Sequence, residues 1–120
     1  MEIQVDWSRN AGVLIAKPIG RIYSANYLEW QTAIESGIEA GDQAMAVDFG
    51  QVPYLSSAGL RVLLMTAKRF KGPGRAFVLC NLTRTVRKVI AASGFDGVIP
   101  VYDTEATAVA AITGEGNADG

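Results

Sequence analysis

The sequence predicts an α/β fold in which helices cover a mixed, mostly parallel β-sheet. The 120 residues suit one compact domain, and 49% hydrophobic against 19% charged residues favours a packed core over disorder. Two strand-like segments come first, and from residue 44 onward short apolar runs alternate with segments of helical periodicity. Because such alternation is typical of parallel strands joined by helices, we expect about five strands and about four helices.

The N-terminal third is expected to form a hairpin and one helix. Segments 3–7 and 12–18 alternate weakly between apolar and polar residues on either side of a turn-rich stretch, which favours two paired strands. Apolar residues then recur at helical spacing over 25–39, with Ser24 as a candidate N-cap and Gly41 as the expected end.

The rest of the chain is expected to alternate strand and helix. Apolar runs predict buried strands at 44–49, 75–81 and 98–102, and helical patterns predict helices from Ser57 to the Gly72-Pro73-Gly74 break, over 83–92, and from Thr104 onward. Residues 1–113 are therefore expected to form a single domain, and residues 114–120 a loose, flexible tail.

The composition excludes several classes of protein. No apolar run approaches the roughly 20 residues of a membrane span, and the N-terminus has no signal-peptide pattern. The single cysteine, Cys80, excludes an internal disulfide, so the cytoplasm is the expected compartment.

The absence of histidine argues against catalysis. Without it, Ser-His-Asp and Cys-His arrangements and the usual zinc-hydrolase ligand sets are impossible within this chain. An enzyme that uses Asp48, Ser56 or Ser57 as its nucleophile would lack an obvious paired base. We therefore expect a non-enzymatic protein with no catalytic residue and no bound metal.

Charge is distributed unevenly along the chain, although the net charge is only −1. No acidic residue lies between Asp48 and Asp96, where eight basic residues occur: Arg61, Lys68, Arg69, Lys71, Arg75, Arg84, Arg87 and Lys88. One interpretation scatters them over solvated helix faces. The other is a basic face that meets an acidic protein, a phosphate or an anionic surface. An isoelectric point near 5.3 argues against direct binding of nucleic acid.

The junction Tyr-Leu-Ser-Ser-Ala-Gly-Leu at 54–60 is the most distinctive stretch. Its two serines lie where the loop after a buried strand becomes a helix, and serine is a preferred N-cap residue. Gly59 is less ordinary, because glycine in a first turn costs about 1 kcal/mol relative to alanine. It would permit the close approach of another backbone or of a partner.

The helix that follows has a candidate docking face. At about 100° per residue its inner face is expected to comprise Leu60, Leu63, Leu64, Ala67 and Phe70. Val62 and Met65 then lie on the outer face. They are surrounded there by three basic residues, Arg61, Lys68 and Arg69, so this face is interpreted as a docking surface ringed by positive charge.

The motif that begins Asp48-Phe49-Gly50 and ends Leu55-Ser56-Ser57-Ala58-Gly59-Leu60 resembles the signature of STAS domains, the module of sulfate transporters and anti-sigma factor antagonists. The resemblance covers about residues 3–113. It includes Gly20-Arg21-Ile22, Val78-Leu79-Cys80-Asn81, Val86-Arg87-Lys88-Val89 and Ser93-Gly94-Phe95. It implies a STAS-like sandwich.

By this resemblance the family's phosphoacceptor serine falls on Ser57, with Ser56 as the less favoured candidate. Ser56 stands where many antagonists have aspartate, Ala58 replaces a frequent second serine, and Tyr23 occupies the position of a common aspartate. The implied partner-binding residues are Ser56, Ala58, Gly59, Arg61, Val62, Met65, Arg69, Tyr23 and Ser24.

The resemblance also implies a mechanism of partner switching. The unmodified antagonist would bind an anti-sigma factor that is also its serine kinase, phosphorylation would end the binding, and a serine phosphatase would restore it. ATP and magnesium belong to the kinase, so no cofactor is expected. STAS subunits of lipid-transporting ABC systems also carry a hydroxyl followed by Ala-Gly-Leu. A transport accessory that binds the transporter ATPase constitutively is therefore the alternative. The pattern indicates no particular oligomeric state.

Overall fold

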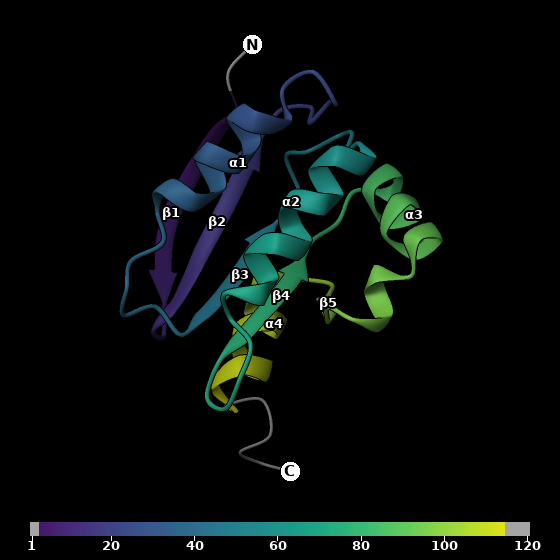
Figure 1. The fold of residues 1–120 in the computed structure, drawn as a ribbon. Helices are drawn as coiled ribbons and strands as arrows, with labels where there is room; N and C mark the ends of the chain where they lie inside the picture. Colours follow the sequence, from purple (N-terminus) through teal and green to yellow (C-terminus); the bar gives the residue numbers. More distant parts are fainter. Residues whose placement is uncertain (1–2, 115–120) are drawn as a thin grey trace.

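The computed structural model describes residues 3–114 and contains the predicted order of elements (Figure 1). The elements are β1 Gln4–Asn10, β2 Val13–Ile19, α1 Tyr27–Ser36, β3 Ala44–Asp48, α2 Ser57–Lys68, β4 Ala76–Cys80, α3 Arg84–Ser93, β5 Val101–Tyr102 and α4 Glu105–Thr113. A short 3-10 helix, Phe95–Gly97, follows α3. Apart from Gly114, the expected C-terminal tail lies outside the described residues.

The five strands form one sheet in the order β1-β2-β3-β4-β5. Strands β1 and β2 pair antiparallel through a two-residue turn at Ala11-Gly12, where both residues have a positive φ, as type I′ hairpin turns require. The remaining neighbours pair in parallel. The predicted mixed, mostly parallel sheet is therefore confirmed.

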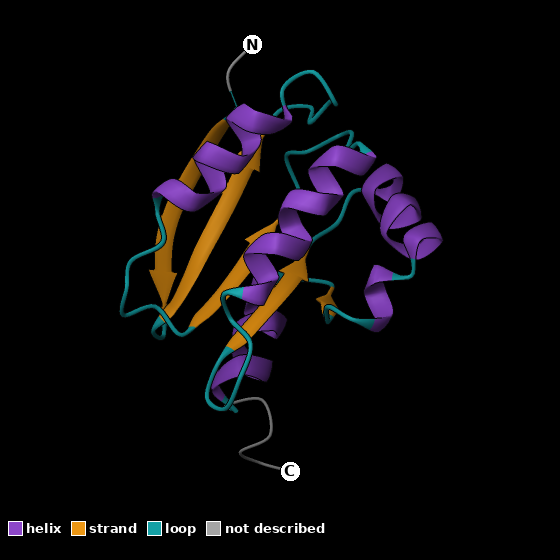
Figure 2. Cartoon of the chain, in the orientation of Figure 1, coloured by secondary structure: helices purple, strands orange, loops and turns teal. Residues whose placement is uncertain are grey.

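Helices cover both faces of the sheet, with α1, α2 and α3 on one face and α4 on the other (Figure 2). The larger core cluster lies between the sheet and the three helices, and it includes Trp30, Phe49 and Leu63. The smaller cluster packs Val13 and Ile15 of β2 against α4. Strands buried on both faces explain why β2, β3 and β4 read as continuous apolar runs.

Most helix ends use the expected capping chemistry. Ser56, Thr83 and Thr104 each accept a hydrogen bond from a backbone N–H of the first turn that they cap. The expectation that Ser24 caps α1 is wrong. Asn26 precedes that helix, and its side chain instead accepts from Tyr23 N at 2.7 Å and donates to a loop carbonyl.

Helix α1 ends at Ser36, earlier than expected. Gly37 follows it, and a Cβ atom at Gly37 would lie 2.2 Å from the indole ring of Trp7. Glycine therefore lets β1 pack against the end of the helix, whereas Gly41 lies in an exposed loop with open space around it. The prediction that Gly41 ends this helix is therefore wrong, because the helix ends before Gly37 instead.

Strand β5 is shorter than the predicted 98–102. Val98 N and Ile99 N both donate to Phe95 O, so the turn after the 3-10 helix uses backbone groups that a longer strand would need. As a result Val98 is 65% exposed instead of lying in the sheet. Within residues 3–114, no helix is both long enough and apolar enough to cross a membrane.

Candidate partner-binding site

Two loops run side by side at the edge of the sheet where β2 and β3 end. Ile22 and Leu55 form a parallel bridge, Ile22 N donates to Tyr54 O at 3.0 Å, and Ser56 N donates to Ile22 O at 2.9 Å. These bonds continue the sheet pairing beyond the strand ends. They therefore hold the β2–α1 loop against the residues that begin α2.

The two adjacent serines have separate roles. Ser56 is 7% exposed, and its Oγ accepts a hydrogen bond from Gly59 N at 3.2 Å, as an N-cap residue does. Ser57 is the first residue of α2 and is exposed. Capping therefore occupies the hydroxyl of Ser56, while that of Ser57 reaches the surface at the positive end of the helix dipole.

Gly59 serves the protein's own core and is buried. A Cβ atom there would lie 2.6 Å from Ile22 Cγ2 and 2.7 Å from Leu55 Cδ1, and Gly59 O accepts a hydrogen bond from Trp30 Nε1. Other atoms do approach this glycine closely, as predicted, but they belong to core side chains of this chain and not to a partner. The expectation that Gly59 contacts a partner at the surface is wrong, and the same burial removes Ser56 from that surface.

The outer face of α2 differs from the one that periodicity predicts. Val62 and Thr66 are each 3% exposed, whereas Leu64 and Ala67 are only half-buried. The expectation that Val62 faces solvent is wrong. Helix α1 packs along this flank of α2, which adds a second buried side to the one facing the sheet. Met65 is 52% exposed, as expected.

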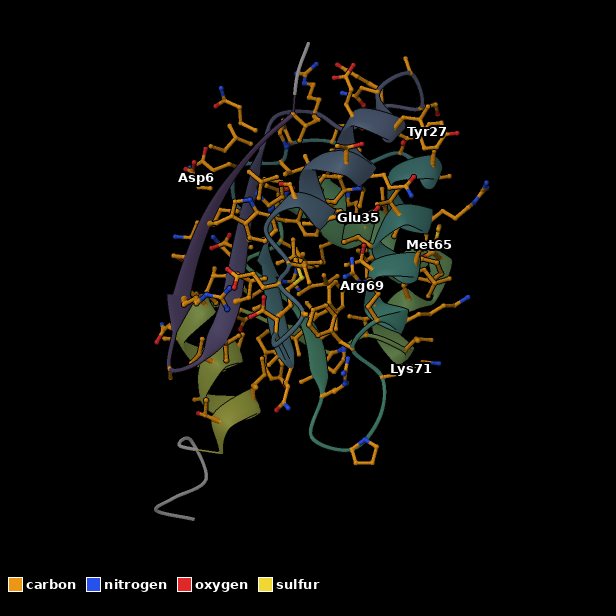
Figure 3. All side chains as sticks on the ribbon, turned by 60° about the vertical axis from the view of Figure 1, so that its left-hand side comes forward. Asp6, Tyr27, Glu35, Met65, Arg69 and Lys71 are labelled. Carbon is orange, nitrogen blue, oxygen red and sulfur yellow. The ribbon has the colours of Figure 1, made fainter. Side chains whose placement is uncertain are left out.

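A small groove of about 240 Å³ separates α1 from α2 on the outer side. Arg69 Nη1 lies 3.9 Å from Glu35 Oε2, and both side chains are about half-exposed. Figure 3 shows these two side chains in the space between the helices, with Met65 farther out on α2. Arg61 and Ser24 are exposed and Ala58 is half-buried. Helical spacing places Arg61, Met65 and Arg69 on the same flank of α2 as Ser57 and Ala58.

Two exposed tyrosines flank the Ser57 end. The ring centroids of Tyr23 and Tyr54 lie 5.7 Å apart, and Arg21 Nη1 donates to the hydroxyl of Tyr23 at 3.4 Å, which raises the pKa of Arg21. Beside them, Arg21 and Tyr23 line a depression of about 790 Å³. Sequence reasoning identified Tyr23 but missed Arg21 and Tyr54. The position of Tyr54 at the start of the distinctive 54–60 junction was the available signal for that residue.

The other candidate nucleophile has a structural role. Asp48 is buried, and its Oδ1 accepts from Gly50 N at 2.9 Å and from Asn81 Nδ2 at 3.1 Å, which ties together the ends of β3 and β4.

Burial raises the pKa of Cys80, the last residue of β4, to about 12. No group of three or more His, Cys, Asp or Glu residues within 3–114 is placed to hold a metal ion.

Comparison with known proteins matches residues 4–108 to the STAS domain. BtrV of Bordetella bronchiseptica, named as a candidate anti-sigma factor antagonist, is 37% identical over 100 residues, which are 83% of this chain and 86% of BtrV. An anti-sigma factor antagonist from Mycobacterium paratuberculosis has a similar structure, with a TM-score of 0.84 and 24% identity over 93% of this chain and 95% of that one.

The antagonist SpoIIAA also shares this fold. Its unphosphorylated form gives a TM-score of 0.72 at 19% identity, covering 93% of this chain and 96% of SpoIIAA. A structure of the phosphorylated form from Bacillus gives a TM-score of 0.64 at 18% identity, covering 92% and 98%.

Proposed function

The chain belongs to the STAS domain family and resembles its anti-sigma factor antagonists, and on that premise we propose that it binds an anti-sigma factor with serine kinase activity and is switched off by phosphorylation at Ser57. Its role is then regulatory, and a serine phosphatase returns the modified protein to its binding state. The relative named BtrV and the structure of phosphorylated SpoIIAA support this proposal.

The observation that carries the proposal is the difference between Ser56 and Ser57. A kinase needs a hydroxyl that it can reach, and the cap position buries Ser56 while the next residue is exposed. Ser57 also lies at the end of the surface that includes Tyr23 and Arg61. A phosphate placed there would be part of any contact that a partner makes with this end of α2.

A phosphate on Ser57 acts on binding more than on folding. It adds about −1.5 to −2 charges at a helix N-terminus, where a negative charge is favoured by about 0.3–1 kcal/mol. In a closely packed interface without a new partner, the same charge costs several kcal/mol. Since about 1.4 kcal/mol is a factor of ten, a penalty of about 4 kcal/mol weakens binding roughly a thousandfold.

The proposed binding surface consists of exposed or half-buried residues around Ser57, and the buried residues beneath them act as its support. The surface comprises Tyr23, Ser24, Ala58, Arg61, Met65 and Arg69, together with Tyr54, which the tertiary structure adds. Ser56, Gly59 and Val62 hold this surface from below. A change in one of these three would therefore alter the shape of the surface without removing a contact.

The test is affinity capture from a lysate of the source organism with the wild-type protein and with Ser57→Ala, Ser57→Asp and Thr107→Asp. Thr107 is exposed in the first turn of α4, on the opposite face of the sheet, so its variant adds the same charge at a comparable helix position. Wild type, Ser57→Ala and Thr107→Asp should retain an anti-sigma factor. Ser57→Asp should bind it at least a hundredfold more weakly.

Mass spectrometry after incubation of the captured kinase with ATP and magnesium should place the phosphate on Ser57. Phosphate on another residue, or none, would contradict the acceptor assignment. Equal capture of a transporter ATPase by all four proteins would instead support the constitutive transport accessory.

A further inference from the structure

A second groove lies at the opposite end of α2 from Ser57 and encloses about 370 Å³. It forms where α2 ends, where β4 begins and where the segment after the 3-10 helix passes. Its lining consists of Leu64, Ala67, Lys68, Phe70, Lys71, Gly72, Arg75, Ala76, Phe77, Val78, Val98, Ile99 and Pro100. Ser57 and Lys68 are the first and last residues of α2, so a rise of 1.5 Å per residue separates them by about 17 Å.

The floor of this groove is apolar. Phe70 and Phe77 are nearly buried, their ring centroids lie 6.0 Å apart, and Ile99 is packed beside them in the same core cluster. Val98 lies at the edge and is 65% exposed, because the turn after the 3-10 helix holds it out of the sheet. An apolar side chain that entered the groove would therefore remove Val98 and the half-buried Leu64 from water.

The rim of the groove is positively charged. Lys68, Lys71 and Arg75 are all exposed, and no acidic residue lines the groove. Arg75 Nη1 donates to Arg69 O at 2.7 Å near the end of α2, which holds its guanidinium in place. Lys68 and Lys71 form no ion pair with any residue between 3 and 114. Three cations therefore surround an apolar floor with no counter-charge of their own.

We propose that this groove binds a protein segment in which apolar side chains are flanked by carboxylates. The apolar side chains of the segment would pack on the floor, and its carboxylates would pair with the cations of the rim. An uncharged segment would lack the ion pairs, and a basic segment would be repelled by the rim. The apolar floor is recessed below the exposed cations, which suits the projecting side chains of a peptide better than a flat lipid surface. The site is separate from Ser57, and its occupant should bind equally well to the phosphorylated and unphosphorylated states.

The test is an NMR titration of the ¹⁵N-labelled full chain with a blocked peptide of sequence Glu-Glu-Leu-Phe-Glu-Glu. Backbone amide shifts are expected at the groove and not at the Ser57 end. The same peptide with lysine in place of glutamate should cause no shifts there. The variant Lys68→Gln/Lys71→Gln should weaken binding by about 4- to 25-fold, since each exposed ion pair contributes about two- to fivefold.

The matched control is Arg84→Gln/Lys88→Gln, which removes two exposed charges from α3 outside the groove and should change the affinity less than twofold. Ser57→Asp should likewise bind the peptide within twofold of wild type.

No shift with the acidic peptide at millimolar concentration, or equal shifts with the lysine peptide, would overturn the proposal. Binding to phosphatidylglycerol vesicles without binding to the peptide would assign the groove to a lipid surface instead. Because the titration needs no anti-sigma factor, its outcome is independent of the proposed function.

Discussion

The indole Nε1 of Trp30 donates a hydrogen bond to the carbonyl oxygen of Gly59 at 3.1 Å, so α1 and α2 are joined directly beneath the first turn that carries Ser57. Trp30 is fully buried, and its ring also packs against Phe49 at a centroid distance of 6.2 Å. The surface proposed to meet a partner is therefore supported from within the core. Its shape depends on residues that a partner never touches.

Trp30→Phe should lower the free energy of unfolding by about 2–3 kcal/mol, because it removes the buried indole hydrogen bond to Gly59 O and leaves a cavity where the larger ring was. Urea unfolding measures this change. Tyr27→Phe is the control, since Tyr27 is 39% exposed and should shift the value by less than about 0.5 kcal/mol. Equal effects of the two substitutions would contradict the role given to the indole.

Gly59→Ala should destabilise the protein by about 1–3 kcal/mol, although alanine is the better helix former. The added methyl group would overlap Cγ2 of Ile22, which is β-branched and buried and so has little room to move. Gly41→Ala, in an exposed loop with open space around it, should be nearly neutral. Thermal or urea unfolding compares the two, and a stabilised Gly59→Ala protein would exclude the steric explanation.

Ser56→Ala and Ser57→Ala should differ in stability although they alter adjacent hydroxyls. Loss of the N-cap at Ser56 should cost about 1 kcal/mol, whereas loss of the exposed hydroxyl at Ser57 should change the free energy of unfolding by less than about 0.5 kcal/mol. Parallel urea titrations measure both. The reverse order would mean that the two serines have been assigned to the wrong roles.

Asp42 should make part of the stability dependent on acid pH. Hydrogen bonds from Arg9, together with one from Glu39 N, lower the pKa of this buried carboxyl. A pKa lower in the folded state means that the contribution is fully present above the unfolded value of about 4 and is lost as the pH falls through the folded value. Asp42→Asn should therefore be less stable than wild type at pH 7, with a difference that shrinks below about pH 4 in urea unfolding.

Cys80 should be unreactive in the native protein. It is buried, and burial raises its pKa to about 12, so almost no thiolate exists at pH 8. Alkylation by iodoacetamide at pH 8, followed by mass spectrometry, should be slow without denaturant and rapid in concentrated urea. Rapid modification of the folded protein would show that the end of β4 opens to solvent.

The sequence was sufficient to predict which segments form strands and helices and how they connect. Apolar runs such as 44–48 and breaks such as Gly72-Pro73-Gly74 are local features, and the secondary structure they predict depends mainly on neighbours along the chain. Within the described residues, the predictions failed where specific contacts, some distant and some local, differ from those that an apolar pattern indicates. Helix α1 ends before Gly37, where only glycine leaves room for the indole of Trp7, and Phe95 O accepts from the Val98 and Ile99 donors that would have lengthened β5.

For the site, the sequence by itself identified the stretch around Ser57, because the motif consists of consecutive residues and can be recognised without a structure. Only the tertiary structure decided which of its side chains reach solvent. A helix covered on one side by a sheet and on a second side by α1 has a narrower exposed face than periodicity alone predicts, so Val62 is buried while Met65 is not. Tertiary packing also buries Ser56 while leaving Ser57 exposed, and it brings the ring of Tyr54 beside that of Tyr23. Burial of a side chain depends on elements that meet only when the chain has folded.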